Sequence, residues 1–183
     1  ASIPTTRQQI YFIDNDDYFN RRQMSTDEKG VEYTDNGERA IFFARGVLET
    51  VKKLRWQPDV IVCQGWVSAV VPFYIKTAYD SKVICAIYPS ELKGSLGHNF
   101  KQCVEYREAT PDKLTEYGDN FDFVELAKMA IDYSDGVVEA AEGVNAELIK
   151  YAEDKNKPLL RFPGDDFAEP YAKLINEVCP DEE

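Results

Sequence analysis

Apolar residues along this chain follow two different spacings. Short runs of consecutive apolar, often β-branched residues are typical of strands buried on both faces, and positions recurring every three or four residues are typical of one helix face. The runs predict strands within residues 9–13, 60–63, 82–88, 135–140 and 158–162. The helical spacing predicts helices at residues 38–54, 67–79, 121–133, 145–153 and 167–178. Strands that alternate with helices indicate parallel βαβ units.

The predicted fold class is therefore α/β, with a mostly parallel, doubly wound sheet flanked by helices. The chain has 183 residues, of which 44% are hydrophobic and 13% aromatic, so it can bury the core of one such domain. Residues 21–36 and 91–99 are polar and contain glycine, which favours loops. Residues 100–120 have a weaker pattern and predict one short helix and a connector.

The stretch around the second predicted strand is the best candidate for a site. Gln64 and Gly65 end the apolar run, and Trp66 opens the following helical pattern. Ligands of open α/β sheets bind beyond the carboxyl ends of the strands. We therefore expect these three residues near any site, together with Tyr88 at the end of the next predicted strand.

Charge and cysteine content narrow the possible partners. The net charge of −12 disfavours nucleic acid and anionic membranes, because both would repel the chain. No apolar run approaches the roughly 20 residues that span a bilayer. The four cysteines are widely spaced without a CxxC pair, which favours reduced thiols and a cytoplasmic location. They are Cys63, Cys85, Cys103 and Cys179.

Motifs for metals, phosphates and nucleophiles are weak, so no cofactor and no metal are predicted. The chain has one histidine, His98, which favours an exposed loop residue over a ligand. The acidic cluster Asp14–Asp17 lacks the glycine and terminal glutamate of a calcium loop, which favours capping and solvation. Lys93–Gly97 is neither a P-loop nor a dinucleotide fingerprint, and Ser68 lacks the frame of a nucleophile elbow. A hydrolase built on a chance pair of carboxylates is a weaker alternative.

Four blocks keep a common order and spacing along most of the chain: Ile10–Asn15 with Tyr18-Phe19, Asp35–Arg39 with Phe42–Arg45, Pro58–Cys63 with Trp66, and Lys128–Val137. Together these blocks resemble the N-terminal catalytic domain of bacterial glycogen and starch synthases, which transfer glucose from ADP-glucose to an α-1,4-glucan. The resemblance extends to short synthase-like proteins that carry only this first half. It implies a Rossmann-like domain, one half of a two-domain glycosyltransferase. It also implies substrate-binding candidates at Asp14, Asn15, Tyr18 and Trp66.

The departures from that family concern its catalytic positions. The family's His-x-His-Asp-Trp motif reads Val62–Trp66 here, with Gln64 and Gly65 in place of the second histidine and the aspartate. Tyr88 stands where the family has an active-site histidine. The resemblance therefore implies no catalytic residue in this chain. It implies one domain over residues 1–183, without the family's upstream strands and donor loop and without its C-terminal nucleotide-sugar domain.

Three functions remain open from the sequence. The leading hypothesis is a catalytically degenerate relative that binds α-glucan or a partner protein, with Trp66, Tyr18, Phe19 and Tyr88 as aromatic platforms. The second is a part of an active ADP-glucose-dependent glucosyltransferase. The third is a structural or regulatory subunit that pairs with a complete synthase or with another copy of itself. Alternatively, these aromatic residues only fill the core. The exposed fraction of each side chain distinguishes a binding surface from core packing.

Overall fold

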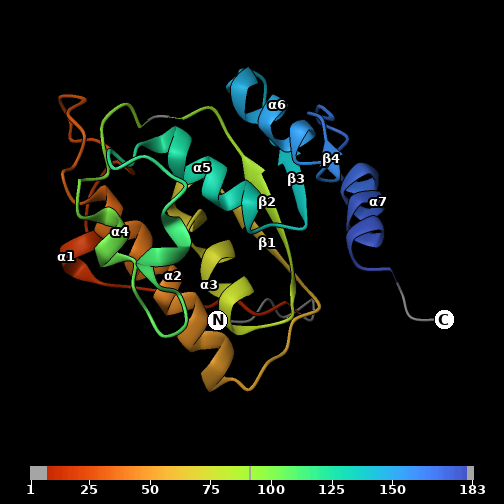
Figure 1. Ribbon diagram of the computed structural model, residues 1–183, viewed down its shortest axis with the longest axis horizontal. Helices are drawn as coiled ribbons and strands as arrows, with labels where there is room; N and C mark the ends of the chain where they lie inside the picture. The colour runs from red at the N-terminus through yellow and green to blue at the C-terminus, as the bar shows by residue number, and fades with distance from the viewer. Residues whose placement is uncertain (1–7, 91, 181–183) are drawn as a thin grey trace.

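The computed structural model describes residues 8–90 and 92–180 and contains one parallel sheet (Figure 1). Its strands are β1 (Val60–Gln64), β2 (Lys82–Ile87), β3 (Gly136–Glu139) and β4 (Leu159–Leu160), in the spatial order β1-β2-β3-β4. The register pairs Cys63 with Cys85 and Ala86 with Val138. All neighbouring strands are parallel, so their carboxyl ends lie at the same edge of the sheet.

The helices agree with the predicted ones within a few residues at each end. They are α1 (Asp16–Phe19), α2 (Asn36–Lys53), α3 (Val71–Ala78), α4 (Phe100–Cys103), α5 (Phe123–Asp132), α6 (Ala146–Asp154) and α7 (Ala168–Val178). The helix predicted for residues 67–79 is divided into a 3₁₀ turn, Trp66–Ser68, and α3. A second 3₁₀ turn spans Pro111–Leu114. Pro72 lies in the first turn of α3, where its missing N–H removes no helical hydrogen bond.

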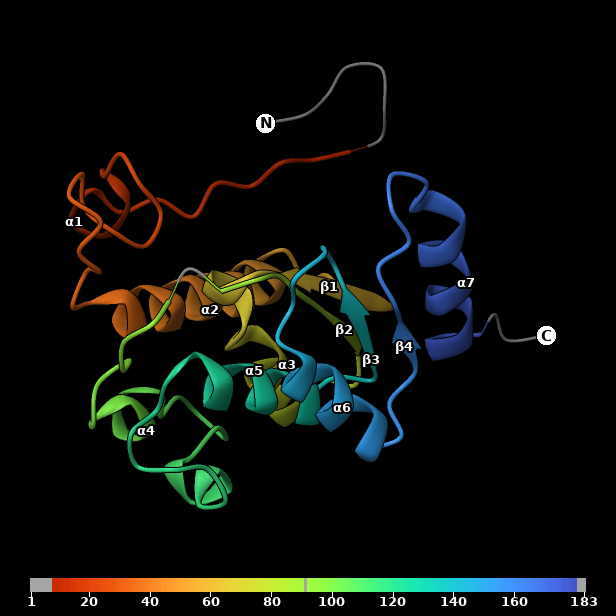
Figure 2. The same cartoon turned by 90° about the horizontal axis from the view of Figure 1, so that it is seen from above.

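Helices cover the two faces of the sheet unequally, as Figure 2 shows. One face packs against α2, α3, α5 and α6 around a large core that includes Phe73, Ile75 and Leu126. On the opposite face Leu174 and Val178 of α7 complete a smaller core with strand residues. The predicted Rossmann-like α/β fold, with a parallel sheet flanked by helices, is confirmed. The second face stays open beside β1, where 38% of Val62 is exposed.

The predicted strand at residues 9–13 is wrong. Gln9 forms a single β-bridge, and the following residues run as an extended segment outside the sheet (Figure 2). Phe12 is 78% exposed, whereas Ile13 packs on α2 at Gly46, where an added Cβ would lie 2.7 Å from the Ile13 Cγ2. An apolar run becomes a strand only when a neighbouring strand pairs with it, and among the described strands none lies beside this segment. The sheet therefore has four described strands where five were predicted.

Asp35 directly precedes α2 but does not cap this helix with its side chain. It accepts hydrogen bonds from Arg21 instead, at 2.7 Å to Oδ1 and 2.5 Å to Oδ2. These two charge-assisted hydrogen bonds are stronger than a neutral capping hydrogen bond. The ion pair therefore ties the loop before α2 to the start of that helix.

Candidate functional site

A tight turn at the carboxyl end of β1 positions the central candidates. Gly65 has a φ of 72°, a left-handed conformation that a residue with a Cβ adopts only under strain. Its N–H donates to the Ala86 carbonyl at 3.2 Å, which extends the pairing with β2. The Ser68 hydroxyl donates to the carbonyls of Gln64 at 2.8 Å and Gly65 at 3.1 Å. The turn therefore holds the Gln64 and Trp66 side chains at the end of the sheet.

A crevice of about 430 Å³ opens at the ends of β1 and β2. Its lining includes four apolar or aromatic side chains and two polar ones: Met24, Trp66, Tyr88, Phe123, Gln64 and Ser90. Among residues 8–90 and 92–180, no charged side chain lines it. The volume lies within the range of small-molecule sites. The structure thus brings together four of the candidates from the sequence, Gln64, Gly65, Trp66 and Tyr88.

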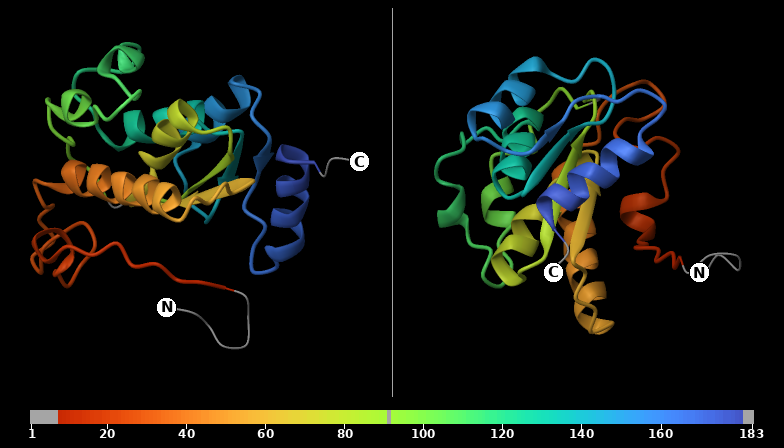
Figure 3. Two further views of the ribbon diagram at one scale, coloured as in Figure 1. Left: turned by 90° about the horizontal axis from the view of Figure 1, so that it is seen from below. Right: turned by 90° about the vertical axis from the view of Figure 1, so that its right-hand side faces the viewer.

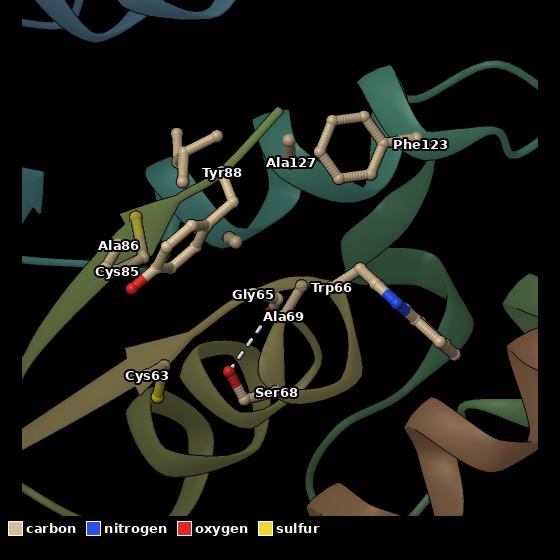
Figure 4. A pocket seen from close by; sticks show the side chains of 12 residues that line it. Cys63, Gly65, Trp66, Ser68, Ala69, Cys85, Ala86, Tyr88, Phe123 and Ala127 are labelled. Atoms are coloured by element: carbon tan, nitrogen blue, oxygen red, sulfur yellow. Dashed lines mark hydrogen bonds between the residues drawn. The ribbon is translucent and has the colours of Figure 1, made fainter. Parts of the chain in front are cut away.

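The site next to this crevice is mostly apolar and shares Trp66, Tyr88 and Phe123 with it (Figure 4). A small pocket of about 20 Å³ lies there, next to Cys63, Cys85 and Ala127. Burial raises the pKa of the Cys63 thiol well above its usual value, and burial raises the pKa of Cys85 to about 11. Since the thiolate is the nucleophile and the metal ligand, both groups stay protonated and inert at neutral pH.

Arg39 of α2 supports two residues that line the crevice, Met24 and Trp66. Its side chain is buried, with 1% exposed. Its Nε donates to the Tyr18 carbonyl at 2.9 Å, and its Nη1 donates to the Met24 carbonyl at 2.6 Å and to Asn36 Oδ1 at 2.7 Å. The guanidinium carbon lies 5.7 Å from the centre of the Trp66 ring. Burial lowers the pKa of Arg39 from its usual value. This arginine joins α2 to the loop that carries Met24.

The other three candidates lie at α1 and do not line the crevice. Asn15 caps α1, because its side-chain oxygen accepts from the Tyr18 N–H at 3.1 Å. The Tyr18 hydroxyl donates to Glu38 Oε2 at 3.2 Å, and its ring packs 5.2 Å from that of Phe42. Asp14 is exposed. Their role as substrate-binding residues stays a prediction.

Five lining residues were absent from the sequence candidates: Met24, Val67, Pro89, Ser90 and Phe123. In the sequence Phe123 belongs to the apolar stripe of the predicted helix. In the structure it is the first residue of α5 and lies beside the strand ends. The cap at Asp122, whose Oδ1 accepts from the Glu125 N–H at 3.0 Å, is the signal that fixes its place. Met24 is 57% exposed and lies in a loop whose sequence gives no such signal.

His98 and the two cysteines of the predicted strands lie where the sequence predicted. His98 is exposed, as the sequence predicted. All four cysteines are free, and Cys63 and Cys85 are buried. Among residues 8–90 and 92–180, no group of three acidic, histidine or cysteine side chains could hold a metal ion. Within the same ranges, no helix has the length and apolar composition that crossing a bilayer requires.

Comparison with known proteins gives one family. The sequence profile of the starch synthase catalytic domain matches residues 1–161. The glycogen synthase of Chlorobium limicola is 41% identical over 82 residues, which is 44% of this chain and 17% of that protein. The glycogen synthase of Vibrio parahaemolyticus is 37% identical over 102 residues, 52% of this chain and 21% of that protein. The chain therefore matches about a fifth of the length of these relatives.

The fold is also similar to a solved structure. The catalytic domain of Starch Synthase IV from Arabidopsis thaliana, bound to ADP and acarbose, superimposes with a TM-score of 0.56. The match covers 76% of this chain and 31% of that one, at 15% sequence identity. At this identity the likeness concerns the fold alone.

Proposed function

The chain belongs to the starch synthase catalytic domain family, and from this premise we propose that it binds an α-1,4-glucan at the ends of β1 and β2 without transferring glucose by itself. The observation that carries the proposal is the lining of the crevice, which is rich in aromatic residues and, in the part of the chain that the structure describes, contains no charged side chain. It favours the catalytically degenerate, carbohydrate-binding member of the three hypotheses.

A neutral sugar chain matches the side chains of the crevice. A glucose ring has apolar C–H faces that stack on aromatic rings, and hydroxyl groups that need hydrogen-bond partners. Trp66, Tyr88 and Phe123 provide aromatic surface. Gln64 provides an amide that both donates and accepts. A few placed polar groups within a mostly apolar lining are usual for small-molecule sites.

A nucleotide-sugar donor matches the same crevice poorly. Its diphosphate requires cations or a free helix N-terminus directed at it. Among the described residues neither lysine nor arginine lines the crevice. The N-terminus of α5 lies beside the crevice, but the carboxylate of Asp122 already caps it and would repel a phosphate. Arg39 lies over Trp66, but its guanidinium is buried and already bonded. The net charge of −12 adds a general repulsion. We therefore assign donor binding to other sequence, on the same polypeptide or on a partner chain.

The proposal concerns one part of a larger catalytic unit. The Arabidopsis domain is bound to ADP and acarbose, and we propose that this chain contributes to the carbohydrate part of such a site. At the family's histidine and aspartate positions it has Gln64, Gly65 and Tyr88, which supply neither an imidazole nor a carboxylate. The proposal includes a cytoplasmic location, which suits four free cysteines.

The test is calorimetric titration of the 183-residue chain with maltoheptaose. We expect saturable binding, and we expect Tyr88→Ala to weaken it about tenfold, which corresponds to one stacking contact of about 1.4 kcal/mol. Tyr11→Ala is the matched control, since Tyr11 is exposed to 48% and Tyr88 to 39%, and Tyr11 lies outside the crevice. Equal affinities of the two variants would reject the crevice as the binding site.

A contact with a partner protein or a second copy is the other role that the surface favours. Ile10, Tyr11 and Phe12 are 41%, 48% and 78% exposed, and Trp56 is 55% exposed. Clustered apolar exposure of this kind is typical of interaction surfaces. Sedimentation equilibrium checks this role: a mass that rises with concentration supports self-association, and one monomer mass at every concentration argues against it.

A further inference from the structure

A second groove lies beside the crevice, on the open face of the sheet. Its volume is about 540 Å³, and it lies between the ends of β1 and β2, the segment after β4 and the start of α7. Its principal lining residues are Val62, Gln64, Tyr88, Phe162, Phe167 and Tyr171. Gln64 and Tyr88 line the crevice as well, so the two hollows meet at these side chains.

The groove exists because α7 covers only part of its face of the sheet. In the right panel of Figure 3, α7 crosses the sheet and leaves β1 uncovered beside it. Val62, Phe162 and Phe167 are consequently 38%, 36% and 59% exposed. Gly164 has a φ of 73° in the turn between β4 and α7. This turn brings the two phenylalanines of the connecting segment to the same groove.

The aromatic wall of the groove is held in place by packing. The Phe167 ring meets the Tyr171 ring edge to face, with centroids 6.2 Å apart and planes at 80°. Tyr171 is half-buried and packs against the smaller core under α7. An aromatic surface that is fixed before binding loses little conformational entropy when a ligand stacks on it.

The charge of the lining selects the class of ligand. Among the described residues, no charged side chain lines the groove, although charged residues make up 30% of the chain. An anion would find no cation there, and a cation would find no carboxylate, so a neutral ligand fits best. Exposed aromatic faces beside the Gln64 amide suit a neutral sugar in the same way as the crevice does.

We propose that the groove extends the glucan site, so that a long α-1,4-glucan lies across Tyr88 with sugar units in both hollows. This inference rests on the proposed function. A short oligosaccharide occupies the crevice alone, whereas a longer one also reaches Phe162 and Phe167. The site therefore prefers long glucan chains, and the groove residues set that preference.

The experiment compares maltotriose with maltoheptaose by calorimetric titration of the wild-type chain and of Phe167→Ala. We expect Phe167→Ala to lower the affinity for maltoheptaose about fivefold to tenfold. The same substitution should change the affinity for maltotriose by less than about twofold. Phe162→Ala is a second groove variant with the same expected result. Val31→Ala is the control, because Val31 is 61% exposed and lies outside both hollows. Circular dichroism checks that each variant is folded.

The outcomes separate this inference from the proposed function. If the wild-type chain binds neither sugar, the proposed function fails and the groove fails with it. If the wild-type chain binds maltoheptaose and both groove variants bind it equally well, the groove inference alone is overturned. An equal loss for maltotriose and maltoheptaose also contradicts it, because the short sugar would then occupy the groove.

Discussion

Replacing Arg39 by methionine should destabilise the fold and loosen the wall of the crevice. Arg39 donates to the carbonyls of Tyr18 and Met24 and to the Asn36 side chain, within 2.6–2.9 Å. Methionine fills a similar volume but donates nothing. The Asn36 acceptor is buried, and the two carbonyl acceptors are partly buried. A buried acceptor that loses its partner costs about 1–3 kcal/mol and a partly buried one costs less, and the removal of a desolvated charge offsets part of that loss. We expect a net destabilisation of about 2–4 kcal/mol, a large share of the usual 5–15 kcal/mol.

Urea unfolding of Arg39→Met, with Arg22→Met as the control, measures this loss in the free energy of unfolding. The Arg22 side chain is 85% exposed and pairs with the 68% exposed Glu28, so its replacement should change the free energy of unfolding by less than about 0.5 kcal/mol. Hydrogen exchange should also accelerate in residues 18–24 more than in α5. A loss below about 1 kcal/mol for Arg39→Met would refute the reasoning, since it would mean that the three hydrogen bonds contribute little.

Two further predictions concern the ion pair before α2 and the packing of α7. Hydrogen bonds from Arg21 lower the pKa of Asp35, so the pair stabilises the fold above the unfolded pKa of about 3.9 and loses that effect as the pH falls through the lower folded pKa. Asp35→Asn should flatten the decline in stability below about pH 4 in urea titrations, and an unchanged profile would contradict this. In Gly136→Ala the added Cβ would lie 2.9 Å from Val178 Cγ2, which should destabilise by about 1–3 kcal/mol in thermal unfolding. Gly118→Ala meets nothing within 4 Å, and equal effects of the two variants would contradict the packing argument.

The sequence predicted the elements whose pattern is complete within a short segment. The continuous apolar runs of β1 and β2 and the helical stripe of α2 were recognisable because burial on two faces, or on one stripe, constrains every position. The run at residues 9–13 failed because pairing of a strand depends on a neighbour that local sequence does not specify.

The candidate site was only partly predictable for a related reason. Gln64, Trp66 and Tyr88 follow parallel strands, and the carboxyl ends of those strands meet at one edge of the sheet. Their convergence could therefore be expected from the fold class. The exposure of Phe162 and Phe167 depends on how much of the sheet α7 leaves uncovered, which no local pattern contains.

The central claim is that this member of the family binds a neutral glucan and not the nucleotide donor. Parallel calorimetric titrations of the 183-residue chain with maltoheptaose and with ADP-glucose test it most directly. The account predicts saturable binding of maltoheptaose and no saturable heat with ADP-glucose. Binding of ADP-glucose at a similar affinity, or no saturable heat with maltoheptaose, would contradict it.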